Sequence, residues 1–264
     1  MTDASVKTIQ KPARRDILDI EVAWLDWPQA FVCIKEALAA DGQTVFAFLN
    51  ANNANLATKN TAFRNALAHS TILPDGLGVD MAARALHGSP FPANLNGTDF
   101  IPALLTYLRE PRRVALIGAR PEVLAKATQA LRQRCPWHEF TAVSDGFFDG
   151  DGGQRALAEL SDIRPDIVLV AMGSPRQELW IENNIRGKHG KVVFAVGALF
   201  DFVSGAVPRA PLWIRRLRCE WVFRLVCEPR RLWRRYLVGN PIFFFRVLRY
   251  KYFRRKDAGG PAAV

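Results

Sequence analysis

The chain lacks several features by which whole classes of protein are recognised. Its 264 residues include only four cysteines, without a CxxC spacing or a neighbouring histidine cluster, so neither a disulfide framework nor a zinc site is expected. No apolar run reaches the length of a membrane span. The first residues, MTDASVKTIQKPARRD, contain no apolar segment of the kind found in signal peptides. Together these absences predict a cytoplasmic protein.

Motifs of common enzyme classes are missing as well. There is no GxxxxGK[ST] loop of a P-loop NTPase, and RVALIGARPEVLAKA lacks the GxGxxG of a dinucleotide-binding turn. GxSxG is absent and the four histidines stand in no motif, which argues against a Ser–His hydrolase. Asp149-Gly150-Asp151 resembles the DxD of some metal-dependent sugar transferases, but Gly-rich turns commonly space carboxylates in this way. We therefore predict no metal site and no cofactor.

Acidic residues are scarce near the C-terminus. Between Arg209 and Lys256 there are fifteen Lys and Arg but only two acids, Glu220 and Glu228, which gives this segment a net charge of +13. Because the whole chain carries +11, the remainder carries about −2. Basic segments bind phosphates, whether on nucleic acid, on anionic lipid or on a diphosphate substrate.

Short apolar runs alternate with longer amphipathic stretches up to about residue 205, which predicts an α/β fold with a mostly parallel sheet flanked by helices. The predicted strands are Ile17–Val22, Thr44–Leu49, Thr71–Leu73, Arg113–Ile117, Glu139–Val143, Ile167–Met172 and Val192–Val196. The predicted helices are Pro28–Ala40, Leu56–Ala68, Gly78–His87, Asp99–Arg109, Pro121–Arg134, Gln154–Ile163 and Pro175–Ile185.

In such folds ligands bind at the carboxyl ends of the strands, where loops lead into helices. Six loops there are rich in glycine, amides, acids and aromatics, and they predict one polar cleft. One of them, Pro74-Asp75-Gly76, places a carboxylate at the mouth of a strand. Asp-Gly is also ordinary turn chemistry, so this loop alone does not identify a catalytic residue.

Past Gly205 the pattern changes. Trp213 to Leu237 predicts basic helices with interleaved aromatics, Gly239-Asn240-Pro241 predicts a break, and IFFFRVLRYKYFRR is typical of a helix that lies in a membrane interface. A solvated basic helix packed on the body is the plainer interpretation. We predict a body over residues 16–205, an arginine-rich helical appendage over 206–256 and a disordered end over 257–264.

Arginines interleaved with aromatics also suit a non-enzymatic protein that binds nucleic acid or anionic lipid.

Taken together, the loops resemble the WecG/TagA/CpsF family of bacterial glycosyltransferases, in family order from about residue 45 to 238. The most specific set is PxQExW (Pro175, Gln177, Glu178, Trp180), followed by FDFxSG, RAP and EWxxRLxxEPxRLxxRY. FLNANNANL, ILPDGLGV, NGTDF and DGFF also match. The resemblance implies a Rossmann-like fold and inverting, metal-independent transfer from a UDP-sugar to an undecaprenyl-diphosphate-linked acceptor. It also implies an appendage that closes the active site and touches the inner face of the cytoplasmic membrane, with no nucleic-acid partner; homo-oligomer formation is left open.

The resemblance also assigns residues. Asp75 matches the proposed catalytic base, which takes the proton of the acceptor hydroxyl. Arg224, Arg231 and Arg234 match appendage arginines whose guanidinium groups suit diphosphate oxygens, either on UDP or on the lipid. For the donor it implies Asn52 and Gln177 near the sugar, Asp201 towards the uracil, and Gly146 and Phe147 along the nucleotide. Gln177 and Asp201 are equally typical of helix capping or turn formation.

Two positions depart from the family pattern. Asn50 stands where many members have threonine, which bears on contact with the acceptor or the sugar. Asn94 stands where a basic residue is expected, so one phosphate contact is expected to be missing. These departures leave the transferred sugar open among N-acetylmannosamine, its uronic acid and glucose.

Overall fold

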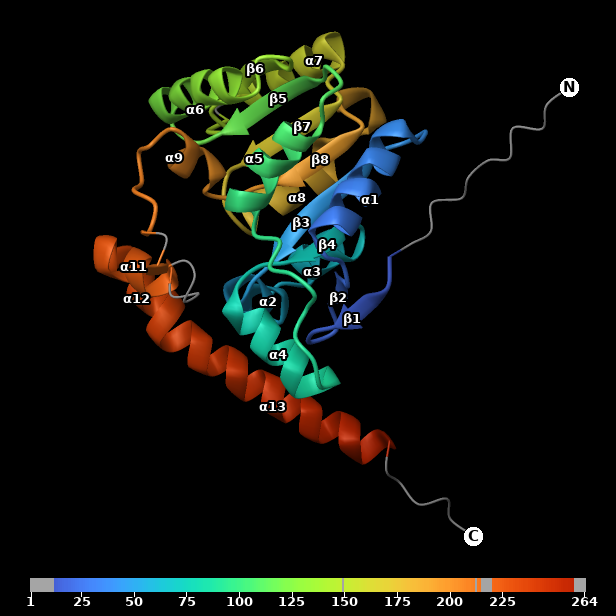
Figure 1. Ribbon diagram of the computed structural model, residues 1–264, viewed down its shortest axis with the longest axis vertical. Helices are drawn as coiled ribbons and strands as arrows, with labels where there is room; N and C mark the ends of the chain where they lie inside the picture. The colour runs from blue at the N-terminus through green and yellow to red at the C-terminus, as the bar shows by residue number, and fades with distance from the viewer. Residues whose placement is uncertain (1–11, 149, 212, 215–219, 259–264) are drawn as a thin grey trace, which may run out of the picture.

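The structure is a computed structural model that describes residues 12–148, 150–211, 213–214 and 220–258. One mixed sheet of eight strands forms its centre, in the order β1-β2-β4-β3-β8-β7-β5-β6 (Figure 1). The strands are β1 Arg14–Asp16, β2 Glu21–Ala23, β3 Thr44–Leu49, β4 Thr71–Pro74, β5 Arg113–Gly118, β6 Glu139–Ser144, β7 Ile167–Ala171 and β8 Val192–Ala195. β1 and β2 pair antiparallel and every other pair is parallel. The predicted α/β fold with a mostly parallel sheet is confirmed.

Helices cover both faces of the sheet. Those of the body are α1 Trp27–Ala39, α2 Ala51–Ala57, α3 Thr61–Ala68, α4 Leu77–His87, α5 Gly97–Tyr107, α6 Pro121–Arg134, α7 Gly152–Ile163, α8 Arg176–Asn184, the short η1 Gly187–His189, and α9 Leu199–Val203. Residues of α1, α5, α6 and α9 share one core cluster, and residues of α2, α3, α4, α7 and α8 share the other.

Successive residues of each central strand point to opposite faces, so they enter different clusters. In β7, Leu169 packs in the first cluster whereas Val168 and Val170 pack in the second, and all three are fully buried. This two-sided burial explains why the strands read as continuous apolar runs without alternation. Because β3 to β8 are parallel, their carboxyl ends and the six predicted loops meet along one edge of the sheet.

The predicted strand Ile17–Val22 is wrong over residues 17–20, and only its last two residues belong to a strand, β2. The chain reverses direction there, because Leu18 and Asp19 adopt positive φ angles of 55° and 63°. Ile17 and Ile20 exchange backbone hydrogen bonds of 2.9 and 3.2 Å across the turn, and β1 and β2 flank it. The turn buries Ile17, Leu18 and Ile20 in the core, so its apolar sequence imitates a strand.

The predicted helix Leu56–Ala68 is two helices. α2 ends at Ala57, and α3 begins at Thr61 after Asn60, whose side chain accepts a hydrogen bond from the backbone N–H of Phe63. Asparagine is a favoured N-cap because its oxygen satisfies an N–H that has no partner within the helix. α2 itself begins at Ala51, capped by Asn50, which places its first turn at the carboxyl edge of the sheet.

The C-terminal helices are α11 Glu220–Cys227, α12 Pro229–Trp233, a π-helical turn η2 Arg234–Val238, and α13 Gly239–Ala258. The predicted break at Gly239-Asn240-Pro241 is wrong, because η2 leads directly into α13. Proline removes a backbone N–H and crowds the preceding turn. A π turn placed just before Pro241 widens the helix there, as π-bulges do.

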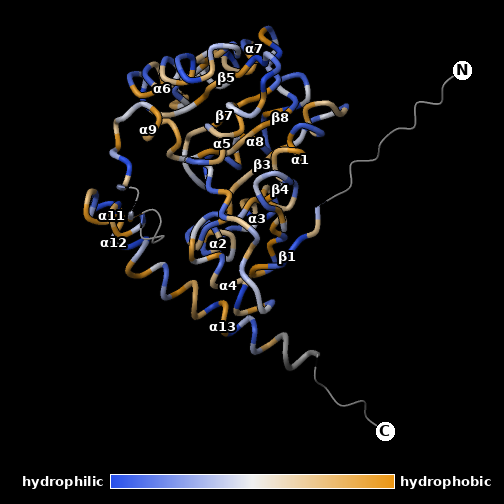
Figure 2. Tube along the Cα trace, in the orientation of Figure 1, coloured by the Kyte–Doolittle hydropathy of each residue, from blue (hydrophilic) through white to orange (hydrophobic). Residues whose placement is uncertain are grey.

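α13 packs against α2 and α4 (Figure 1) and buries Phe243 and Val247 completely. Hydrophobic and hydrophilic residues alternate along it (Figure 2). The helix continues to Ala258, two residues into the end that was predicted to be disordered, and residues 259–264 of that prediction lie outside the described residues. The predicted division of the chain near residue 205 stays a prediction.

Candidate functional site

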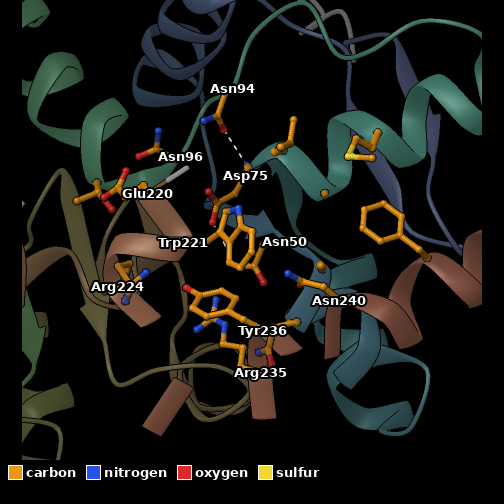
Figure 3. Close-up of a pocket in the computed structure, with 18 of the residues that line it drawn as sticks. Asn50, Asp75, Asn94, Asn96, Glu220, Trp221, Arg224, Arg235, Tyr236 and Asn240 are labelled. Carbon is orange, nitrogen blue, oxygen red and sulfur yellow. Dashed lines mark hydrogen bonds between the residues drawn. The ribbon is translucent and has the colours of Figure 1, made fainter. Parts of the chain in front are cut away.

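Asp75 lies at the carboxyl end of β4, directly after Pro74. Its backbone N–H donates to the carbonyl oxygen of Leu49 at 2.9 Å, which fixes it beside the end of β3. Gly76 has a φ of +91°, a conformation that residues with a side chain rarely adopt. The N–H of Gly76 donates to Oδ1 of Asn94 at 2.9 Å (Figure 3). The Pro-Asp-Gly sequence therefore builds a turn, and that turn presents the Asp75 carboxylate.

Asn50 connects this carboxylate to the first turn of α2. Its Oδ1 accepts from the backbone N–H of Asn53 at 3.0 Å, and its Nδ2 donates to Oδ2 of Asp75 at 3.2 Å. A single amide therefore caps the helix and orients the carboxylate. Threonine is the residue expected here from the family pattern. Its single hydroxyl oxygen would have to accept from the Asn53 N–H and donate to the Asp75 carboxylate, whereas asparagine uses two separate atoms.

The Asp75 carboxyl has its pKa raised above the ordinary aspartate value, chiefly because burial disfavours the charged form. The hydrogen bond from Asn50 and the positive charges of Arg235 and Arg224 act in the opposite direction. Asp99 raises the pKa further through like-charge repulsion. A carboxylate with a raised pKa and a cavity beside it is suited to accept a proton.

A cavity of about 330 Å³ opens over Asp75 (Figure 3). The body contributes loop and helix residues from the ends of β3 and β4 and from the segment before α5. These are Asn50, Ala51, Asn52, Asp75, Gly76, Leu77, Gly78, Met81, Asn94, Asn96, Thr98 and Asp99. The C-terminal helices contribute Glu220, Trp221, Arg224, Arg235, Tyr236, Asn240 and Phe244. The site is thus composite, because neither part lines it alone.

Arg209 joins the two parts at one side of the cavity. Its guanidinium pairs with Asp99 of α5 at 2.6 Å and lies 4.0 Å from Glu220 of α11. Arg209 and Arg224 both lie over the ring of Phe202, at 5.3 and 5.1 Å from its centroid. Cation–π contacts of this kind hold guanidinium groups in place without neutralising them.

Of the predicted site residues, Asp75, Asn50, Asn52 and Arg224 line this cavity together. Gln177 does not line it. Its side chain is 2% exposed, and its Oε1 accepts from the backbone N–H groups of Gly173 at 3.1 Å and Gly197 at 3.0 Å. In this structure Gln177 ties the loops after β7 and β8 to each other.

The remaining predicted donor residues lie along the same edge of the sheet but outside this cavity. Asp201 of α9 is half-buried, and burial raises its pKa while Arg231, Arg120 and Arg224 lower it. Phe147 is 57% exposed, with the guanidinium of Arg176 over its ring at 5.6 Å. Arg176 also donates to the carbonyl oxygen of Gly146 at 2.5 Å.

Of the appendage arginines, Arg231 is exposed and pairs with Glu228 at 2.5 Å, and Arg234 is exposed over the ring of Trp233 at 5.3 Å. Neither lines the cavity, and their roles stay predictions. Arg235, which does line it, was missed by sequence reasoning. A signal was present, because the RLxxRY pattern places an arginine directly before Tyr236.

Among the described residues no group of three His, Cys, Asp or Glu side chains could hold a metal ion. Asp149, one of the acids weighed for that purpose, lies outside the described residues. The prediction that the reaction needs no metal therefore stays a prediction. Of the helices in the described ranges, none has both the length and the apolar character that a membrane span requires.

Comparison with known proteins gives consistent matches. A family model described as the glycosyl transferase WecG/TagA/CpsF family matches residues 15–257. Three similar proteins carry the name N-acetylglucosaminyldiphosphoundecaprenol N-acetyl-beta-D-mannosaminyltransferase. The one from Bacillus spizizenii is 34% identical over 68% of each chain, and the one from Bacillus subtilis is 33% identical over 78% of this chain and 79% of its own. The one from Staphylococcus aureus is 29% identical over 94% of this chain and 97% of its own.

Proposed function

Because the chain belongs to the glycosyl transferase WecG/TagA/CpsF family, we propose that it transfers a sugar from a UDP-sugar to a glycan acceptor carried on undecaprenyl diphosphate. The chain is a glycosyltransferase by that membership. The sugar is of the N-acetylmannosamine type, which includes its uronic acid, or glucose, and the name shared by the relatives favours N-acetylmannosamine. The observation that carries the proposal is the Asp75 carboxylate at a cavity whose wall also bears the Arg224 guanidinium.

In the proposed reaction Asp75 is the general base. The acceptor hydroxyl gives its proton to the Asp75 carboxylate while its oxygen bonds to the anomeric carbon of the donor. The bond from that carbon to the β-phosphate oxygen breaks on the opposite face, so the configuration inverts and UDP departs. One positioned carboxylate suffices, because the diphosphate leaves as a stable anion without a general acid.

The departing diphosphate must be stabilised, and we assign this role to cationic side chains. Arg224 supports the assignment, because it lines the cavity and its buried Nε has no hydrogen-bond partner among the described residues. A guanidinium presents paired N–H groups that match two phosphate oxygens. This is also why we propose a metal-independent reaction.

The rest of the donor is proposed to lie along the carboxyl edge of the sheet, from Asn52 near the sugar towards Gly146, Phe147 and Asp201 near the nucleotide. Exposed Phe147, stacked with Arg176, offers an aromatic surface for a uracil ring. Gln177 acts as a positioning residue in this scheme, because its Oε1 is already used by two loop N–H groups.

A UDP-release assay on the purified full-length protein tests the proposal. The panel contains UDP-N-acetylmannosamine, its uronic acid form, UDP-glucose and other UDP-sugars, each with a short-chain N-acetylglucosaminyl lipid diphosphate and with EDTA. We expect release with UDP-N-acetylmannosamine, dependent on the acceptor and resistant to EDTA. Release that requires a divalent ion would contradict the metal-independent mechanism. Absence of release with every donor would contradict the proposed function.

We further expect the appendage to bind the inner membrane surface. Phe245 and Leu248 of α13 are 67% and 62% exposed, and they share one helix face because they are three residues apart. The buried Phe243 and Val247, four residues apart, share the opposite face. Inserting both side chains into a lipid interface should favour binding, and the basic residues of the segment should favour anionic lipid. The absence of a nucleic-acid partner and homo-oligomer formation stay predictions.

Flotation with vesicles measures this membrane contact. The wild type should float with anionic vesicles and much less with zwitterionic ones. The double change Phe245→Ser and Leu248→Ser should weaken binding about tenfold, since two partly inserted side chains contribute on the order of 1–2 kcal/mol. Val32→Ser, which removes a 48% exposed apolar side chain from α1, is the control and should float like the wild type. Equal flotation of the double variant would refute the assigned face.

A further inference from the structure

Adjacent arginines at the π turn have different environments. In a regular helix, Arg231, Arg234 and Arg235 would share one face, because they are three and four residues apart. In η2 the N–H of Gly239 donates to the carbonyl oxygen of Arg234, a five-residue spacing that shifts the helix phase. Arg234 is exposed over Trp233, whereas Arg235 is half-buried and lines the cavity beside Tyr236 (Figure 3).

Arg235 forms no ion pair with any described residue. Its Nε is buried without a hydrogen-bond partner among those residues, and its guanidinium lies over the ring of Tyr236 at 5.5 Å from the centroid. The charge of Asp75 offsets part of this cation, but aromatic contact does not neutralise a guanidinium, and a buried charge without an ion pair is costly. The side chain is therefore held in a position that an anionic ligand would complete.

Arg224 is in the same situation within the same cavity. Its Nε is also buried and without a partner among the described residues. Of the carboxylates that line the cavity, Asp99 pairs with Arg209 and Glu220 lies 4.0 Å from Arg209. Asp75 is bonded by Asn50. Two guanidinium groups thus face one cavity without an ion pair to any described acid, although the charge of Asp75 acts on both, and like charges repel unless an anion lies between them.

Among the described body residues that line the cavity, none is a lysine or an arginine. Asn94, on the loop before α5, uses its Oδ1 to accept the Gly76 N–H, and it carries no charge. Asn94 therefore cannot make the ionic contact with a phosphate that a basic side chain would make from the loop before α5. Arg235 enters the same cavity from the opposite part of the chain, on the C-terminal helices.

We infer that Arg235, together with Arg224, binds a diphosphate group in the cavity and supplies the cationic contact that Asn94 does not. This inference rests on the proposed function for the identity of the ligand. The diphosphate belongs either to the nucleotide donor or to the lipid-linked acceptor. In either case the two guanidinium forks take non-bridging phosphate oxygens, and Asp75 remains free to accept a proton.

The test compares four single variants of the full-length protein: Arg235→Ala, Arg235→Lys, Arg234→Ala and Arg230→Ala. Arg230 is exposed on α12 and serves as the matched charge control. Three quantities are measured: the Kd of UDP by calorimetry, the Kd of inorganic pyrophosphate, and the KM of a short-chain lipid-diphosphate acceptor. Thermal unfolding checks each variant, and Arg235→Gln replaces the alanine variant if that one does not fold.

We expect Arg235→Ala to weaken diphosphate binding about 10- to 100-fold, as for loss of a charged hydrogen-bond pair, and Arg235→Lys to restore part of it. Arg230→Ala should behave as the wild type. A rise in the Kd of UDP assigns the contact to the donor, whereas a rise confined to the acceptor KM assigns it to the lipid. Wild-type values for Arg235→Ala in all three measurements, or a larger loss in Arg234→Ala, would overturn the inference.

Failure of the proposed function would look different. If the wild type released no UDP from any donor, the acceptor KM would be undefined but both dissociation constants would still be measured. Weaker pyrophosphate binding by Arg235→Ala would then support the diphosphate site without the reaction. Pyrophosphate binding that did not change would count against the site itself.

Discussion

Asp75→Asn should reduce UDP release at least about 10²-fold while leaving the protein folded, because asparagine keeps the shape of the side chain but accepts no proton. The substitution preserves the backbone bond from Asp75 to Leu49 and leaves Gly76 in its turn. Binding of UDP should stay within a few-fold of the wild type, since the base contacts the acceptor hydroxyl and not the nucleotide. Turnover assays and calorimetry on the same preparation separate the two effects.

The same variant should be more stable than the wild type at neutral pH. Burial raises the pKa of Asp75 in the folded protein, so the ionised carboxylate costs folding free energy wherever the pH exceeds that raised value. Below the ordinary aspartate pKa both folded and unfolded chains are protonated, and the cost disappears. The difference in Tm between Asp75→Asn and the wild type should therefore be positive near pH about 7 and shrink towards pH about 4.

Asp41 provides the control for both measurements. It is exposed in the turn before β3, so Asp41→Asn removes an equal charge away from the cavity and should change neither turnover nor Tm appreciably. Turnover by Asp75→Asn within a few-fold of the wild type would contradict its assignment as base. A lower Tm for that variant at neutral pH would mean that the Asn50 bond and the arginine charges outweigh the effect of burial.

Much of the fold follows from the sequence because its physical causes are local. Runs such as Ile167–Ala171 are buried on both faces, and they appear as unbroken apolar segments. Parallel pairing then brings the loops after the strands to one edge, which is why Asp75 and Asn50 were expected near one cleft and are joined by a hydrogen bond. Tertiary contacts determine the rest: residues 17–20 form a turn because Ile17, Leu18 and Ile20 fill the core where the backbone reverses.

The arginines show where sequence reasoning about the site fails. Arg234 and Arg235 are neighbours of one type, and only the helix phase decides which of them enters the cavity. That phase shifts at the π turn over Arg234–Val238, and beyond it α13 packs on α2 and α4. Gln177 is a similar case. A glutamine in this motif is equally consistent with a ligand contact and with the two hydrogen bonds that its side chain accepts from backbone N–H groups.

Phe243→Ala should reduce both stability and activity although Phe243 does not line the cavity. The side chain is fully buried in the core that α13 shares with α2 and α4, and its ring lies close to Gly78. Replacing a buried phenylalanine with alanine typically costs about 3–5 kcal/mol of unfolding free energy. Because Asn240 and Phe244 of the same helix line the cavity, loosening α13 should also displace them and reduce UDP release.

Phe245→Ala is the matched control, since the residue is two positions away on the same helix but 67% exposed. It should change the unfolding free energy by no more than about 0.5 kcal/mol. Urea unfolding measures the loss, and UDP release is assayed where the variant is folded. α13 is also held by polar contacts, from Asn55 Nδ2 to the Gly239 carbonyl at 2.7 Å and from Arg246 to Asn55 Oδ1 at 2.6 Å.

The shape of the unfolding curve tells how the helix is coupled to the body. A single transition at lower urea would mean that α13 and the sheet unfold together, so the cavity is as stable as the core. A separate early transition, with activity lost across it, would mean that α13 detaches first and carries Asn240 and Phe244 away from Asp75. Full activity and wild-type stability in Phe243→Ala would contradict the packing on which the composite cavity depends.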